Sequence, residues 1–384
     1  MEDLDINISL YQKNGQNISP FIAKNDVDKG EEQQLVFELE NRESQIDDIF
    51  VTIKTAQNLL LQQHLPISCI EKGKTYWEWD GFNNNGIYDS SLLKQRPISV
   101  IFQVKSGVKQ KIITKTLIAR SAKRKWLDIR VDRNKKSVDV TLRLNIKDAG
   151  AKGLGKAVSR QLENNPLYKA LPSGDPKKQP HLRYKSFSSL KDIVFSGIKN
   201  YWQQNIVATD GNTYSLNIES VNAKKDAMND ISIVYNTNRE WLNYGSSNPI
   251  KNALPILNQF LNHKIAYNTG WVKYNNEWFY EDAADADREF SEVAAYEIGH
   301  EMLRTAGEAY HYKDLAEISH QQSLATADLP YQFNAGQFTP RAEAINYYSG
   351  DKPENLHIPT KASADDIIAL LQLASLKFYT GKSI

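Results

Sequence analysis

The sequence predicts an α+β protein of two domains, a β-sandwich followed by a domain in which helices pack on a small sheet. Short runs of alternating apolar and polar residues, separated by turn-rich segments, fill the first third of the chain. Helical spacing of apolar residues then appears after residue 188. A length of 384 residues also exceeds one ordinary domain, so each part is long enough to bury a core.

The first domain is predicted from alternating runs at residues 34–39, 49–53 and 98–104. Several short strands at this spacing are typical of a sandwich. A further strand pair is expected at residues 126–131 and 138–144, and this pair is compatible with either domain. We place the boundary so that the domains cover residues 1–122 and 123–384.

A dense turn at residues 77–86 contains Trp79, Asp80 and Gly81. It resembles the Trp-Asp-Gly loop of immunoglobulin-like domains found in flagellar hook-capping proteins, which implies an immunoglobulin-like sandwich. Phe82 stands where a calcium loop needs an oxygen ligand after Asp80, so we interpret the segment as a structural turn.

The second domain is expected to begin with a helix capped by Ser188. Asp210 and Gly211 lie between two apolar runs and predict a β-hairpin. Residues 231–235 and 265–267 predict two more strands.

A second long helix is predicted at residues 285–305, with acidic residues in its first turn and Gly307 after its end. Its apolar residues occupy nearly all sides of the axis, which predicts burial on most faces: Phe290, Val293, Ala294, Ala295, Ile298, Met302 and Leu303. Glu297 and His300 lie inside this run, where a polar side chain needs a partner or a metal.

Tyr296 and His300 are four residues apart, on one helix face, with Glu297 beside them. This is the spacing of H-E-x-x-H helices, in which two side chains one turn apart bind zinc, a third ligand comes from downstream and a water occupies the fourth position. Zinc lowers the pKa of that water to about 7, and the intervening glutamate takes its proton during attack on a peptide carbonyl. Gly299 would leave room for a neighbouring backbone or a substrate.

Residues 294–303 resemble the A-A-H-E-F-G-H-x-x-L helix of zincin toxin domains linked to type VI secretion and to Rhs or VgrG-type proteins. The resemblance extends to the strand pair at 126–144, to residues 341–348, and to a terminal helix at 363–371 with Ser363 as N-cap. It implies a secreted antibacterial effector for bacterial competition, a zinc metallopeptidase (hydrolase) with Glu297 as general base. His300 and His320 would be zinc ligands, and Tyr296 would complete or replace the first ligand.

The motif departs from the family pattern at Tyr296, which stands at the first-histidine position, and a phenol is a weaker zinc ligand than an imidazole at neutral pH. Tyr296 has three interpretations: a metal ligand, a hydrogen-bond donor to the transition state, or a core aromatic. His311 competes with His320 as the downstream ligand, and Glu297 with His300 also fits a plain hydrogen-bonded pair. The alternative function is therefore an inactive pseudo-metalloprotease that binds a partner protein.

The expected partners are a protein or peptide substrate, a secretion-apparatus component such as a VgrG spike, and an immunity protein. A formal net charge of +1 argues against a nucleic-acid partner. The N-terminus lacks an apolar leader and no run of about 18 apolar residues occurs, so we expect no membrane anchor. We expect the protein in the bacterial cytoplasm before secretion, and then its delivery into target cells without a cleavable signal peptide.

Overall fold

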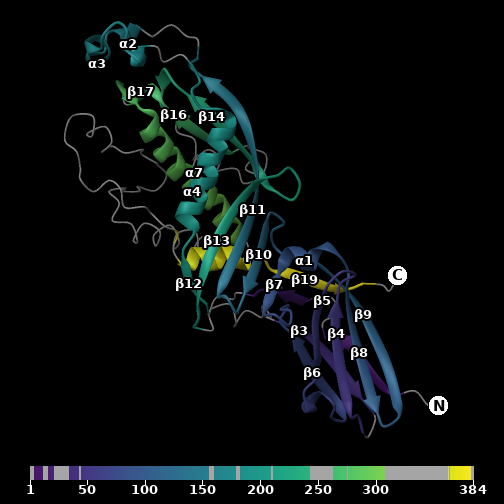
Figure 1. The fold of residues 1–384 in the computed structure, drawn as a ribbon. Helices are drawn as coiled ribbons and strands as arrows, with labels where there is room; N and C mark the ends of the chain where they lie inside the picture. The colour runs from purple at the N-terminus through teal and green to yellow at the C-terminus, as the bar shows by residue number, and fades with distance from the viewer. Residues whose placement is uncertain are drawn as a thin grey trace. The chain divides into compact units, whose positions relative to one another are not determined.

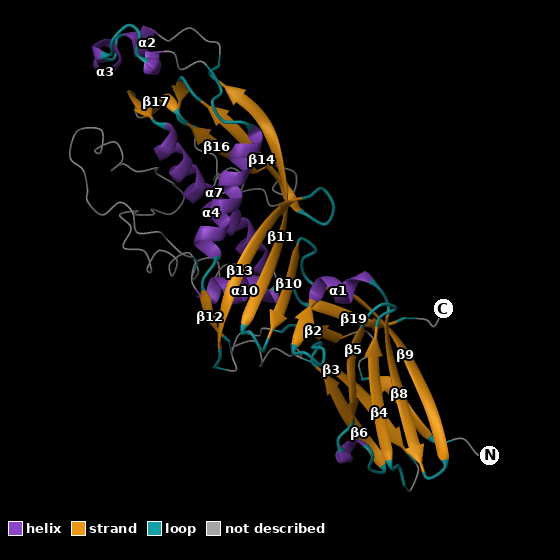
Figure 2. Cartoon of the chain, in the orientation of Figure 1, coloured by secondary structure: helices purple, strands orange, loops and turns teal. Residues whose placement is uncertain are grey.

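The computed structural model shows a mainly β protein with some helices (Figures 1 and 2). It describes residues 4–11, 16–20, 34–42, 45–154, 160–178, 182–208, 211–242, 263–274, 276–307, 362 and 364–381. The chain forms two compact units: the first holds residues 1–141, 204–217 and 367–384, and the second holds 142–203 and 218–366. The units are therefore discontinuous in sequence, whereas the sequence analysis placed a single boundary after residue 122.

The first unit contains two antiparallel sheets. The smaller has the strand order β1 (Ile6–Leu10), β3 (Leu35–Asn41), β6 (Gly73–Trp79). The larger has the order β2 (Gln16–Ile18), β19 (Leu376–Thr380), β9 (Lys109–Ser121), β8 (Ile98–Ser106), β4 (Asp48–Lys54), β5 (Leu59–His64). The expected strands at 34–39, 49–53 and 98–104 are confirmed as β3, β4 and β8.

Alternating side chains of the two sheets form one core. The ring of Phe37 on β3 lies 5.6 Å from that of Phe102 on β8, and Trp77 on β6 lies 5.9 Å from Phe102. Trp79 on β6 contacts Phe378 on β19 with ring centroids 6.2 Å apart. Because these contacts join both sheets, the sheets pack face to face, as the alternation predicts.

The turn after β6 is held by its own polar groups. The Trp79 Nε1 donates to the Phe82 carbonyl at 2.9 Å, and the Phe82 amide donates to Asp80 Oδ1 at 3.1 Å. Arg133 donates to Asp80 Oδ2 at 2.6 Å, and its guanidinium lies 3.5 Å from the centre of the Phe82 ring. These contacts agree with the interpretation of a structural turn.

A seven-stranded sheet has the order β12 (Asn205–Val207), β13 (Thr213–Asn222), β11 (Ser137–Lys152), β10 (Leu127–Asp132), β7 (Ile87–Asp89). Two further strands, β14 (Met228–Asn236) and β16 (His263–Asn268), extend it in parallel from β11. The predicted strand pair at 126–144 corresponds to β10 and β11. The predicted hairpin corresponds to β12 and β13, which are antiparallel.

The second unit places two long helices beside β14 and β16, α4 (Phe187–Trp202) and α7 (Ala283–Gly307). The predicted cap of α4 was wrong by two residues. Ser186 caps the helix, because its side chain accepts the Ser189 amide, whereas Ser188 already lies in the first turn.

The remaining elements of the described chain are short. They are α1 (Ser90–Gln95), α2 (Arg160–Glu163), α3 (Pro166–Ala170), α10 (Ala364–Gln372), the 3-10 turns η2 (Ile67–Cys69) and η3 (Pro176–Lys178), and the sheet β15 (Arg239–Glu240), β17 (Gly270–Tyr274), β18 (Glu277–Glu281). The expected terminal helix is confirmed as α10, although Ser363 lies outside the described residues. None of the described helices is both long enough and apolar enough to cross a bilayer.

Candidate functional site

Helix α7 carries the motif that the sequence analysis singled out. Its bounds, Ala283–Gly307, confirm the helix expected at 285–305. The backbone at positions 296, 297 and 300 is helical throughout, while the side chains of Tyr296, Glu297 and His300 lie outside the structural description. His311 and His320 also lie outside the described residues, so all of these site assignments stay predictions.

Among the α7 residues whose burial is described, the buried side chains gather on one side of the helix. The buried side chains include Phe290, Ala294, Ala295, Ile298, Glu301 and Met302. Of the apolar residues expected to be buried, Val293 is half-buried, and the burial of Leu303 lies outside the structural description. At roughly 100° per residue, position 300 falls about 180° from Ser291 and about 140° from Ala295, whereas position 296 falls about 100° from Ala295.

Close contact between α4 and α7 explains two glycines. A Cβ on Gly197 of α4 would lie 2.4 Å from the Ser291 carbonyl oxygen of α7, and a Cβ on Gly299 of α7 would lie 2.6 Å from Cζ2 of Trp202. The Trp202 Nε1 also donates to the Ala295 carbonyl at 3.3 Å. Gly299 therefore makes room for an indole ring of α4, and the suggestion that it accommodates a backbone or substrate is corrected.

The first turns of α7 form a network of charged and phenolic groups. Asp282 caps the helix, because its Oδ1 accepts the amides of Ala284 and Asp285. Asp287 accepts from the Tyr267 hydroxyl at 2.7 Å and from Lys185 Nζ at 2.5 Å. Burial, followed by the hydrogen bond to Asp287, raises the pKa of Tyr267, so this phenol stays protonated.

A groove of about 690 Å³ runs along the surface where α4 meets the start of α7. Its lining residues are Asp192, Ile193, Ser196, Asn200 and Tyr201 from α4, and Asp287, Arg288 and Ser291 from α7. This groove was not predicted from the sequence. A signal was present, because polar residues at 192, 196 and 200 repeat every fourth position and so form one row on the helix.

The donor chemistry of the motif fits zinc in part. An imidazole at 300 and a phenol at 296, one helical turn apart, supply two of the ligand types that bind metal ions. Within the described ranges, no group of three or more His, Cys, Asp or Glu side chains is placed to hold a metal. His311 and His320, the expected downstream ligands, lie outside those ranges.

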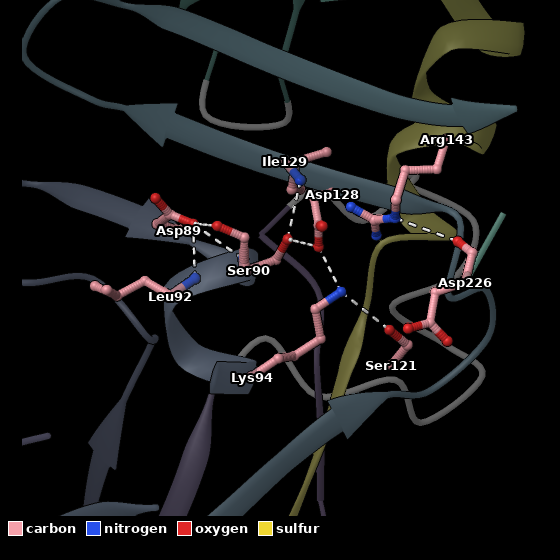
Figure 3. Close-up of polar contacts among 10 residues, drawn as sticks. Asp89, Ser90, Leu92, Lys94, Ser121, Asp128, Ile129, Arg143 and Asp226 are labelled. Carbon is pink, nitrogen blue, oxygen red and sulfur yellow. Dashed lines mark hydrogen bonds and ion pairs between the residues drawn. The ribbon is translucent and has the colours of Figure 1, made fainter. Parts of the chain in front are cut away.

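A second polar cluster lies in the first unit and is structural (Figure 3). Ser90 of α1 donates to Asp128 Oδ1 at 3.0 Å and accepts the Ile129 amide at 2.9 Å. Lys94 of α1 pairs with Asp128 and donates to Ser121 Oγ. Ser90 is fully buried, and this serine, lysine and aspartate join α1 to β10 and β9.

Comparisons with known proteins leave the family open. No family model and no curated protein matches the sequence. Among solved structures, Parabacteroides merdae β-glucuronidase is matched at 10% identity with a TM-score of 0.18 over 80% of this chain and 33% of that chain. A calcium-binding mutant of Bacteroides uniformis β-glucuronidase 2 is matched at 12% identity with a TM-score of 0.15 over 79% of this chain and 31% of that chain. The chain thus spans about a third of each enzyme, and scores this low carry no argument about fold or function.

Proposed function

We propose that residues around α7 form a zincin-like metallopeptidase site with an altered H-E-x-x-H motif, in an effector that hydrolyses peptide bonds. The observation that carries this proposal is the unbroken helix α7, which holds positions 296 and 300 one turn apart. Position 300 lies on the side of α7 away from Ser291 and Ala295, which contact α4, and position 296 lies between that side and Gly299, which contacts Trp202 of α4. A site centred on the side of position 300 would leave the contacts of Ser291 and Ala295 with α4 intact.

In this proposal His300 and Tyr296 would hold zinc together with His320 or His311. Bound zinc supplies Lewis acidity and lowers the pKa of a coordinated water. Glu297, the neighbour of Tyr296 on the same turn, would take the proton from the attacking water and pass it to the leaving amine. The phenol of Tyr296 has a reference pKa of about 10, so it also suits hydrogen-bond donation at neutral pH.

The proposed function includes delivery of the protein into other bacteria. The two face-to-face sheets of the first unit support an immunoglobulin-like sandwich, which would load the protein onto a secretion-apparatus component such as a VgrG spike or bind the target. Delivery into competing bacteria by a type VI apparatus, and neutralisation by an immunity protein, follow from the resemblance of residues 294–303 to zincin toxins.

Metal analysis and one substitution test the enzymatic function. Protein purified without chelator should hold about one zinc per chain, and Glu297→Gln should abolish proteolysis and toxicity while the far-UV circular dichroism stays unchanged. The matched control is Glu277→Gln, because Glu277 is exposed on β18. If Glu297→Gln leaves full activity, Glu297 is not the general base.

The alternative is a pseudo-metalloprotease that binds a partner protein without cleaving it. Tyr296 at the first-histidine position favours this alternative, because a protonated phenol is a poor zinc ligand. A chain that holds no zinc, remains toxic as Glu297→Gln and captures a target protein would support binding over catalysis.

A further inference from the structure

Trp202 lies at the end of α4, directly against the turn of α7 that carries the motif. Its indole is 5% exposed, and its Nε1 donates to the Ala295 carbonyl at 3.3 Å. Its ring occupies the space of the side chain that Gly299 lacks, since a Cβ there would lie 2.6 Å from Cζ2. Residue 295 directly precedes the motif and residue 299 lies within it, so one ring contacts α7 at two points of the motif turn.

The contact between Trp202 and α7 differs in chemistry from the contact between Gly197 and α7. In an α-helix the Ala295 carbonyl already accepts the Gly299 amide, so Trp202 adds a second donor to the same oxygen. At Gly197, more than one turn earlier on α4 than Trp202, the helices meet through the Ser291 backbone and hydroxyl instead. Of these two contacts, the one made by Trp202 falls on the motif turn itself.

We propose that Trp202 is a positioning residue that fixes the rotation and backbone of α7 at residues 295–299, and so orients the side chains at 296, 297 and 300. The effect of this positioning on zinc binding rests on the proposed zincin-like function, because metal ligands depend on neighbours that fix their orientation. Its physical basis is independent of metal, because the ring, the carbonyl and the glycine are in contact in the protein alone.

Hydrogen exchange of the full-length chain tests the contact without zinc. In Trp202→Phe, which keeps an aromatic ring and removes the donor, amides at 296–300 should exchange about fivefold faster, because one hydrogen bond to the helix is lost. Gly299→Ala should give the same local change by displacing the ring. The matched control is Val194→Ala, because Val194 is fully buried on the same helix but lies two turns before Trp202. It should lower the melting temperature without selective acceleration at 296–300.

Zinc affinity, measured by competition with a chromogenic chelator, tests the orienting role. Trp202→Phe should bind zinc about tenfold more weakly than the unaltered chain, whereas Val194→Ala should bind it equally well. Unchanged exchange at 296–300 in Trp202→Phe would overturn the inference, and so would faster exchange with unchanged zinc affinity. If the unaltered chain binds no zinc, the proposed function fails by itself, and the exchange data alone decide whether Trp202 holds this turn.

Discussion

Phe378 joins the last strand of the described chain to the core of the first unit, and its truncation measures what that strand contributes. The side chain is fully buried, its ring lies 6.2 Å from Trp79, and its backbone pairs with Ala119 on β9 and Gln16 on β2. Phe→Ala in a core costs about 3–5 kcal/mol. At about 2–4 °C per kcal/mol, Phe378→Ala should lower the melting temperature of the first unit by about 10 °C.

The neighbouring residue provides the control. Tyr379 is 36% exposed and its side chain points to the opposite face of the same strand, so Tyr379→Ala should cost less than about 1 kcal/mol. Differential scanning calorimetry is the suitable assay, because two units can unfold in separate transitions. Equal shifts for the two variants would show that β19 does not pack in the core as described.

Three further predictions concern charged and phenolic groups. Lys94→Met removes the cation that pairs with buried Asp128 and should lower the unfolding free energy in urea by about 2–3 kcal/mol, whereas the same change combined with Asp128→Asn should cost about 1 kcal/mol. A larger loss in the double variant would refute the pairing. Burial and Asp287 raise the pKa of Tyr267 above its unfolded value of about 10, so this tyrosine stabilises the fold below pH 10 and loses that contribution as pH rises toward its folded pKa. Tyr267→Phe should therefore flatten the decline of stability between pH 9.5 and about 11, as followed by urea titration; an unchanged slope would contradict the shift. Tyr296→His restores two imidazoles one turn apart and should strengthen zinc binding in a chelator competition, while Tyr296→Phe should not; identical affinities for all three chains would show that position 296 is not a ligand.

Much of the fold could be predicted from local patterns. The alternation at 34–39 and 98–104 predicted strands because burial on one face imposes a period of two. Helix α7 was predicted within two residues at each end, because its acidic first turn and terminal glycine follow the chemistry of helix ends. In these cases neighbouring residues carry the information.

Long-range pairing was not predictable in the same way. Residues 376–378 align with residues 16–18, and no local pattern identifies a partner so distant in sequence. This pairing, with that of β19 and β9, brings residues 367–384 into the first unit. The sequence suggested that Gly299 makes room for a backbone or a substrate. A glycine indicates that space is needed but not which neighbour fills it. In the structure that neighbour is the indole of Trp202.

The candidate site was predicted from the spacing of Tyr296, Glu297 and His300, and the structure describes the backbone of these residues as part of helix α7. Helical geometry fixes which positions share a face, so the sequence is sufficient to assign 296 and 300 to one side of the helix. The row at 192, 196 and 200 has the same kind of periodicity, but its partner surface on α7 depends on how the helices pack, which the sequence does not specify.

The place of β19 in the larger sheet of the first unit has a mechanical consequence. The two strands nearest the ends of the described chain, β1 and β19, both belong to the first unit. A force that pulls on residue 381 would first act on the hydrogen bonds that join β19 to β2 and β9. Opening these pairs would remove Phe378 from its contact with Trp79 and leave β9 with an unpaired edge.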